Sequence, residues 1–106
     1  MFKGPRYVTR DISERVSPQL QTILWGLIDQ LRDSRLVVLD SLQVFDLQTI
    51  FDEKGEKLQR ITHRQDRPEF ERVHHFYVDK PMDDKILVID ESEYSTMRFE
   101  QGKPDC

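Results

Sequence analysis

Four segments rich in β-branched and aromatic residues follow one another from residue 36 onward, and the loops between them are short. The segments are residues 36–51, 57–65, 70–78 and 85–91. Partial alternation of apolar and polar side chains over such lengths is typical of half-buried strands. Because the intervening loops are too short to hold a crossover helix, antiparallel pairing of successive strands is favoured. The chain is therefore restricted to a sheet whose consecutive strands are mostly neighbours.

One clear helical pattern precedes these strands. Ser17 followed by Pro18 is a typical helix start, because the hydroxyl can cap the helix and proline loses no hydrogen bond in the first turn. Apolar residues then recur at intervals of three and four, at Leu20, Ile23, Leu24, Leu27 and Leu31. This is the period of one helical face. We expect the helix to end near Arg32 or Asp33, and Gly26 inside it costs about 1 kcal/mol relative to alanine.

These elements predict an α+β fold in two layers, in which one amphipathic helix packs on a mostly antiparallel sheet of four to five strands. The length of 106 residues fits a single domain covering residues 1–106. A short strand is expected at residues 6–9. The tail from about residue 92 is polar, and we expect it either to fray or to add a short element.

Charge and composition narrow the classes of function. The net charge is −4, so the chain as a whole lacks the basic surface of a typical nucleic-acid-binding protein. Residues 54–75 are an exception, with six Lys/Arg against four Asp/Glu. The one cysteine, Cys106, fits a reducing compartment. The chain has no signal-peptide pattern, and its longest apolar run is too short to span a membrane. We therefore expect a cytoplasmic protein without a membrane segment.

The turn at residues 52–56 sets an expected register between two strands. If Phe51 pairs with Lys57, the partners on one side of the sheet include Leu47 with Ile61 and Phe45 with His63. That side is the more apolar, so we predict that it forms the core face, with His63 at the edge of the core. Arg60 and Arg64 would then point to the opposite face.

Four stretches look familiar when they are taken together. They are PRYVTR at residues 5–10, PQLQTILWGLID at 18–29, LQVFDL at 42–47 and ITHRQDRPEF at 61–70. Their order resembles a family of small uncharacterised cytoplasmic proteins of Gram-positive Firmicutes and their phages or other mobile elements. The resemblance covers about the first seventy residues. It implies a bacterial cytoplasmic protein of unknown role, and it brings over no catalytic residues.

The three histidines are the first candidates for a metal or catalytic site. His74 and His75 are adjacent, so on a strand they point to opposite faces and cannot bind one ion together. His63 could join one of them, with a carboxylate as third ligand. The spacings typical of zinc, metalloprotease, EF-hand and nucleophile motifs are absent from the sequence. We therefore expect no metal and no cofactor, and we lean towards a protein that is not an enzyme.

Two groups of residues are candidates for binding another macromolecule. Trp25 lies off the leucine stripe, and with Ile28 it extends the apolar surface of the helix sideways. A tryptophan in this position is either covered by the amino-terminal arm or anchors a partner. The second group is a polar recognition face in the basic segment, made of Arg60, Arg64 and Arg72, and His63 is a further candidate for contact with a partner.

The leading hypothesis is a non-enzymatic module that binds a protein partner or a second copy of itself through these residues. The alternative is a nucleic-acid-binding or regulatory protein that uses the arginine-rich sheet face, with aromatic side chains as stacking platforms. Cross-strand ion pairs with Glu69 or Glu71 would instead make the same face an ordinary solvated surface. An enzyme with a cleft that the sequence hides is the third hypothesis.

Overall fold

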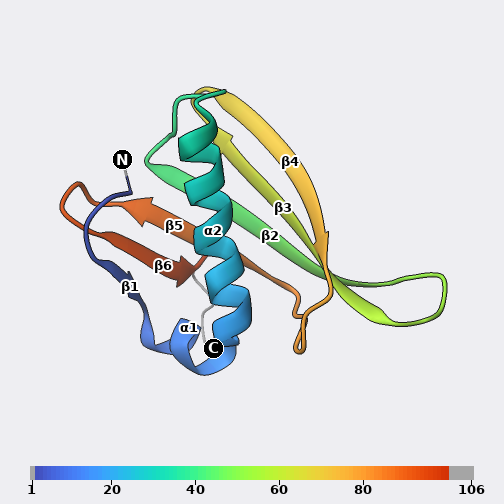
Figure 1. Cartoon of the computed structure of the whole chain (residues 1–106). Helices are drawn as coiled ribbons and strands as arrows, with labels where there is room; N and C mark the ends of the chain where they lie inside the picture. Colours follow the sequence, from blue (N-terminus) through green and yellow to red (C-terminus); the bar gives the residue numbers. More distant parts are fainter. Residues whose placement is uncertain (1, 101–106) are drawn as a thin grey trace.

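The computed structural model describes residues 2–100, and this part of the chain forms two helices and a six-stranded sheet (Figure 1). The elements in chain order are β1 (Arg6–Val8), α1 (Arg10–Arg15), α2 (Pro18–Ser34), β2 (Leu42–Phe51), β3 (Lys57–Asp66), β4 (Glu69–Phe76), β5 (Asp84–Asp90) and β6 (Ser95–Phe99). The strands lie in the order β1-β6-β5-β2-β3-β4. Neighbouring strands are antiparallel except β1 and β6, which are parallel. The predicted two-layer α+β fold is confirmed.

The long helix α2 begins where its sequence signals place it. Ser17 Oγ accepts a hydrogen bond from the Leu20 backbone N–H at 3.2 Å, and Pro18 occupies the first turn. The helix runs to Ser34 and ends at Arg35, which takes the left-handed conformation with φ of 58°. Left-handed residues commonly end helices in this way, because they turn the chain out of the helical path.

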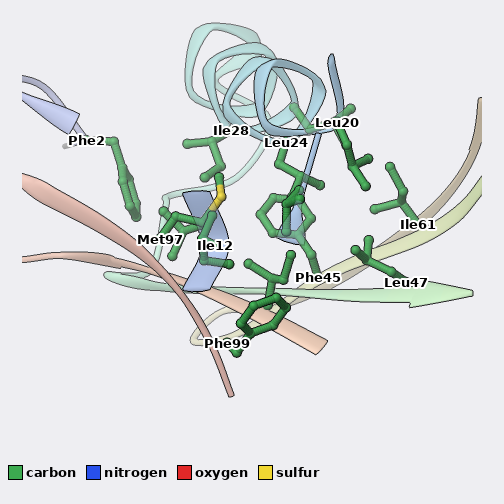
Figure 2. Packing of buried hydrophobic residues seen from close by; sticks show 14 of the residues in the cluster. Phe2, Ile12, Leu20, Leu24, Ile28, Phe45, Leu47, Ile61, Met97 and Phe99 are labelled. Carbon is green, nitrogen blue, oxygen red and sulfur yellow. The ribbon is translucent and has the colours of Figure 1, made fainter. Parts of the chain in front are cut away.

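The core lies between α2 and one face of the sheet. Leu20, Leu24 and Ile28 point down from the helix towards Phe45, Leu47 and Ile61 of the sheet (Figure 2). Each of these side chains is at most 2% exposed. Burying a side chain of this size contributes about 1.5–3 kcal/mol. Other core residues come from the chain ends and from α1: Phe2, Ile12, Met97 and Phe99.

The register predicted across the turn at residues 52–56 is confirmed. The pairs Phe51–Lys57, Leu47–Ile61 and Phe45–His63 all occur between β2 and β3. Asp52 closes this turn, since its side chain accepts hydrogen bonds from the backbone N–H groups of Lys54 and Glu56. A tight turn with fixed partners leaves little freedom for the strands to slip.

Three features of the fold differ from the sequence-based prediction. The sheet has six strands rather than four to five, because residues of the polar tail form β6 and pair with both β5 and β1. The short helix α1 was not expected, and only Ile12 of it is buried. The apolar run at residues 36–41 is not a strand, and β2 starts at Leu42. The end of the tail, where fraying was also considered, lies outside the described residues.

Candidate binding groove between α2 and β4

Two hollows adjoin each other along one side of α2, between this helix and strand β4. The wider one has a volume of about 220 Å³ and is lined by Ile23, Gly26, Leu27, Gln30, His74 and Phe76. The narrower one has a volume of about 40 Å³ and is lined by Leu27, Gln30, Leu31, Ser34, His63, Phe70, Arg72 and His74. Their linings share Leu27, Gln30 and His74, and we call the pair of adjoining hollows the α2–β4 groove.

The groove runs along the edge of the sheet. Its lining residues ascend along α2 from Ile23 to Ser34 while they descend along β4 from Phe76 to Phe70. In the strand order of the described residues, β4 is an end strand that pairs only with β3. Figure 1 shows β4 as the outermost strand at this edge of the sheet. The groove therefore lies next to a strand whose outer backbone edge is free of any other described strand.

The groove wall on α2 contains a glycine in the helix interior. A methyl group added at Gly26 would meet no atom within 4 Å, so no neighbouring group requires a glycine there. Glycine nevertheless destabilises a helix interior by about 1 kcal/mol relative to alanine. The space that a larger side chain would enter belongs to the wider hollow. Gly26 thus keeps open a space that packing alone would allow to be filled.

A hydrogen-bonded chain of side chains lies beneath the narrow end of the groove. His63 Nε2 is 2.6 Å from Gln43 Oε1, and Gln43 Nε2 donates to Gln65 Oε1 at 2.7 Å. Gln65 in turn donates to two backbone carbonyl groups and accepts from the backbone N–H of Asp40. His63, Gln43 and Gln65 are each at most 2% exposed. Buried polar groups that are fully paired in this way do not carry the cost of unpaired ones.

The imidazole of His63 is held in place by aromatic rings as well. It stacks on Phe45 with 4.5 Å between ring centroids, and its edge meets Phe70 at 6.0 Å. Burial lowers the pKa of His63 to about 4, and repulsion from Arg72 and from the protonated form of His74 adds to the effect. His63 is consequently neutral at physiological pH.

The rest of the narrow end is cationic or weakly basic. The pKa of His74 is lowered, first by burial and then by the neighbouring charges of Arg72 and His75. The Arg72 guanidinium lies 5.4 Å from the centre of the Phe70 ring. Among the described residues, Arg72 forms no ion pair with a carboxylate. The groove therefore presents an unpaired positive charge next to two neutral imidazoles.

The sequence-predicted recognition face is divided between the two sides of the sheet. Arg60 and Arg64 lie on the face away from α2, as predicted, and Arg64 pairs with Asp66 at 3.6 Å. Arg72 stands opposite His63 in the β3–β4 register, so it lies on the helix side with that residue. The prediction that Arg60, Arg64 and Arg72 form one face is wrong, because the alternation of β4 was not fixed by any turn that the sequence made evident. His63 is inside the core layer and reaches only the groove.

The two predicted apolar anchors on α2 also have separate places. Ile28 is fully buried in the core and offers no surface to a partner, which corrects the prediction made for it. Trp25 is half-buried, and the Arg6 guanidinium covers its ring at 4.8 Å. Arg6 also pairs with Asp29 one turn further along the helix. The amino-terminal arm therefore covers this flank of α2, while the groove occupies the other flank.

Sequence reasoning missed several residues of this region. The sequence analysis considered Gly26 only as a residue that destabilises the helix. The hydrogen bonds of Gln43 and Gln65 in the core have no sequence signal beyond the place of these residues on the core-facing side of predicted strands. Leu36 and Val38 were assigned to a strand, yet they lie in the loop after α2 and are 75% and 74% exposed. They line a hollow of about 380 Å³ with Arg32 and nearby residues. This second hollow is open, and nothing in the structure indicates what would cover it.

The described residues contain no cluster of three or more side chains able to hold a metal ion. The unpaired charge of Arg72 also disfavours a cation in the groove. Within residues 2–100, neither helix is long and apolar enough to cross a membrane.

The fold and the groove together define a small α+β domain with a hollow between its long helix and an edge strand. Residues 5–101 match the family described as "Staphylococcal protein of unknown function (DUF960)", and because this match covers most of the chain, the protein belongs to that family. The resemblance to uncharacterised Firmicutes proteins is thereby confirmed at the family level, whereas the link to phages and mobile elements stays a prediction.

A solved structure shares this fold. The crystal structure of a protein of unknown function from Enterococcus faecalis superposes with a TM-score of 0.74, covering 99% of this chain and 100% of that one. The two sequences are 19% identical, so the similarity speaks for the fold alone. A comparison with curated proteins finds no significant match.

Proposed function

We propose that this protein is a non-enzymatic interaction module that binds an extended segment of another polypeptide in the α2–β4 groove. The observation that carries the proposal is Gly26. A glycine in the interior of a long helix, with open space where its side chain would be, lowers helix stability without serving the packing of the described chain. The absence of a side chain at Gly26 would allow the backbone of a bound segment to approach the helix closely at this point.

The shape of the groove suits an extended chain rather than a helix or a compact ligand. The groove follows β4 along most of its length, and the outer edge of β4 is free to pair with another strand. Addition of a strand beside a helix is a recurrent mode of peptide recognition, in which the backbone supplies affinity and alternate side chains supply specificity. Ile23, Leu27 and Phe76 would receive an apolar side chain in the wider hollow.

The polar end of the groove indicates which chemical group of the partner would bind there. Arg72 provides a positive charge without a carboxylate partner among the described residues, so it favours a partner group that accepts hydrogen bonds. The expected ligand is therefore an extended segment with an apolar side chain followed, towards the other end of the groove, by a hydrogen-bond acceptor. Protein binding, cytoplasmic location and a mobile-element setting remain predictions that belong to this proposal.

The nucleic-acid alternative receives less support. It requires arginines, histidines and aromatic rings on one basic face, and these residues are divided between the two sides of the sheet. The face away from α2 also places Glu71 directly opposite Arg64. A single-stranded oligonucleotide that binds at low salt and is lost on Arg64→Ala would restore that alternative.

The experiment is a selection of displayed random peptides on the whole protein, followed by affinity measurement on purified variants. Gly26→Trp fills the wider hollow, and Ser13→Trp, at an exposed position of α1, is the matched control. We expect selected peptides to bind Gly26→Trp at least about tenfold more weakly than the parent, a difference of about 1.4 kcal/mol. Ser13→Trp should bind as the parent does. Circular dichroism checks that both variants are folded.

Two outcomes would overturn the proposal. If no peptide is enriched, or if enriched peptides bind Gly26→Trp as tightly as the parent, the groove is not the binding site. Light scattering measures the oligomeric state of the parent and of Gly26→Trp as a second test. If the parent is a dimer that Gly26→Trp dissociates, the occupant of the groove is a second copy of this chain and not a foreign segment.

A further inference from the structure

The narrow end of the groove contains a ring nitrogen whose chemical state is fixed by the residues beneath it. Gln65 directs its amide nitrogen at two backbone carbonyl groups, so its oxygen faces Gln43. Gln43 must then use its nitrogen towards Gln65 and the carbonyl of Asp40, which leaves its oxygen for His63. Since an amide oxygen only accepts, His63 Nε2 must carry the proton. In the neutral imidazole, Nδ1 is therefore an acceptor with a free lone pair.

This lone pair reaches the cavity. Within the described residues, His63 Nδ1 takes part in no hydrogen bond. Among these residues, Ser95 Oγ is the only side-chain polar atom that has neither a hydrogen-bond partner nor contact with solvent, so Nδ1 is not fully enclosed. Nδ1 must therefore keep some accessible surface. Only 2% of the His63 side chain is exposed, and this residue lines the narrow cavity. The small accessible surface of Nδ1 therefore faces the cavity.

The cavity has room for a small polar group. Its volume is about 40 Å³. A bound water needs roughly 10–15 Å³ on the same scale, so about three atoms of that size fit. Ser34 also lines the cavity, but its hydroxyl donates to the Leu31 carbonyl and accepts from the Leu36 N–H. The polar side chains still available to a ligand are those of His63, Arg72, Gln30 and His74. The first two provide a lone pair of fixed position and a cationic donor.

His63 and Arg72 are partners in the β3–β4 register and line the same cavity, so an acceptor and a cationic donor there favour a group that donates and accepts at once. An ionised carboxylate only accepts, so it would face the lone pair of His63. An ammonium group only donates, and it would be repelled by Arg72. A carboxamide satisfies both, because its NH₂ can donate to His63 Nδ1 while its oxygen accepts from Arg72.

We propose that the narrow end of the α2–β4 groove is a subsite for a carboxamide, the side chain of an asparagine or glutamine in the bound segment. Only the statement that the carboxamide belongs to a bound polypeptide segment rests on the proposed function. Because a carboxylate has no hydrogen to donate to the fixed lone pair of His63, the subsite would favour Asn or Gln over Asp or Glu at that position.

The test uses acetamide, acetate and methylammonium as probes, titrated at neutral pH into the whole protein while the ring nitrogens of its histidines are followed by NMR. We expect acetamide to shift the His63 Nδ1 signal saturably, and the other two to shift it at least about tenfold less at equal concentration. Arg72→Gln should weaken the acetamide response about tenfold or more. His75→Gln, exposed on the opposite side of β4, should leave it unchanged.

A cavity that holds water alone would show no preference for acetamide, and this result would overturn the subsite. A protonated Nδ1 in the free protein at neutral pH would overturn it as well. Failure of the subsite is distinguishable from failure of the groove. Selected peptides that need Gly26 but gain nothing from Asn or Gln, with acetamide silent, would refute the subsite alone. Acetamide binding at His63 without any selected peptide would refute the groove as a peptide site and support the subsite.

Discussion

Replacement of Gly26 by alanine is the sharpest test of why the groove exists. Alanine is favoured over glycine in a helix interior by about 0.8–1.0 kcal/mol. The added methyl group meets nothing within 4 Å, so neither a clash nor a packing gain alters this figure. We therefore expect Gly26→Ala to raise the free energy of unfolding by about 1 kcal/mol. For a chain of 106 residues, with about 2.1 cal/mol/K of unfolding entropy per residue, this corresponds to a rise in Tm of about 4 °C.

Urea unfolding followed by circular dichroism measures the change, and an unchanged m-value shows that the folded and unfolded states keep their exposed surface. Gly55→Ala is the control. It also has open space around it, but its φ is +83°, so alanine should there destabilise the protein by about 1 kcal/mol. A loss of stability in Gly26→Ala would refute the reasoning. It would mean that the glycine serves the fold, and the observation behind the proposed function would be gone.

Three further predictions address burial and charge. The pKa of His63 is lowered from 6.5 to about 4, so the unfolded chain binds a proton there before the native one does, and stability should fall by up to about 3 kcal/mol as pH drops from about 6.5 to 4. In urea titrations across this range, His63→Phe should flatten the pH dependence and His75→Gln should keep it. Ile28→Ala should cost about 2–5 kcal/mol in the same assay, and a loss below about 1 kcal/mol would contradict its burial. Arg6→Gln should shift the fluorescence of Trp25 to longer wavelength and cost about 0.5–1 kcal/mol, whereas an unchanged spectrum would show that the guanidinium does not cover the ring.

The parts of the fold that the sequence predicts are those with strong local signals. Ser17 and Pro18 mark the start of α2, and the leucine stripe marks its buried face, because capping and helical periodicity act within a few residues. The turn at residues 52–56 is equally local, so the whole β2–β3 register follows from it. His63 was placed at the core edge by the same reasoning, and it is buried in the layer beneath α2.

The parts that could not be predicted depend on contacts between distant segments. A short strand at residues 6–9 was expected and is β1, but its parallel pairing with β6 joins segments almost ninety residues apart, and no local signal indicates that pairing. The run from Leu36 to Leu39 looks like a strand by composition, yet Val38 faces solvent because no neighbouring strand is available to it. Local preference is overridden by the pairing that the rest of the sheet allows.

The candidate site escaped prediction for a related reason. Its members come from α2, β3 and β4, and the face on which Arg72 lies follows from the β3–β4 register, which no turn signal in the sequence fixed. The roles of Gln43 and Gln65 were hidden as well. Buried glutamines are uncommon. These two are tolerated because Gln43 bonds to His63 and to Gln65, and Gln65 also bonds to backbone groups of the neighbouring loops.

The two flanks of α2 are treated differently, and the difference bears on function. On one flank the chain covers the helix with its own amino-terminal arm, where Arg6 spans Trp25 and Asp29. On the other flank it places Gly26 where a larger side chain would fit. A network that only stabilised the core could be replaced by apolar side chains of similar size with little loss. The polar chain beneath the groove instead fixes which nitrogen of His63 lacks a proton, and under the proposed function that nitrogen is the one offered to the bound segment.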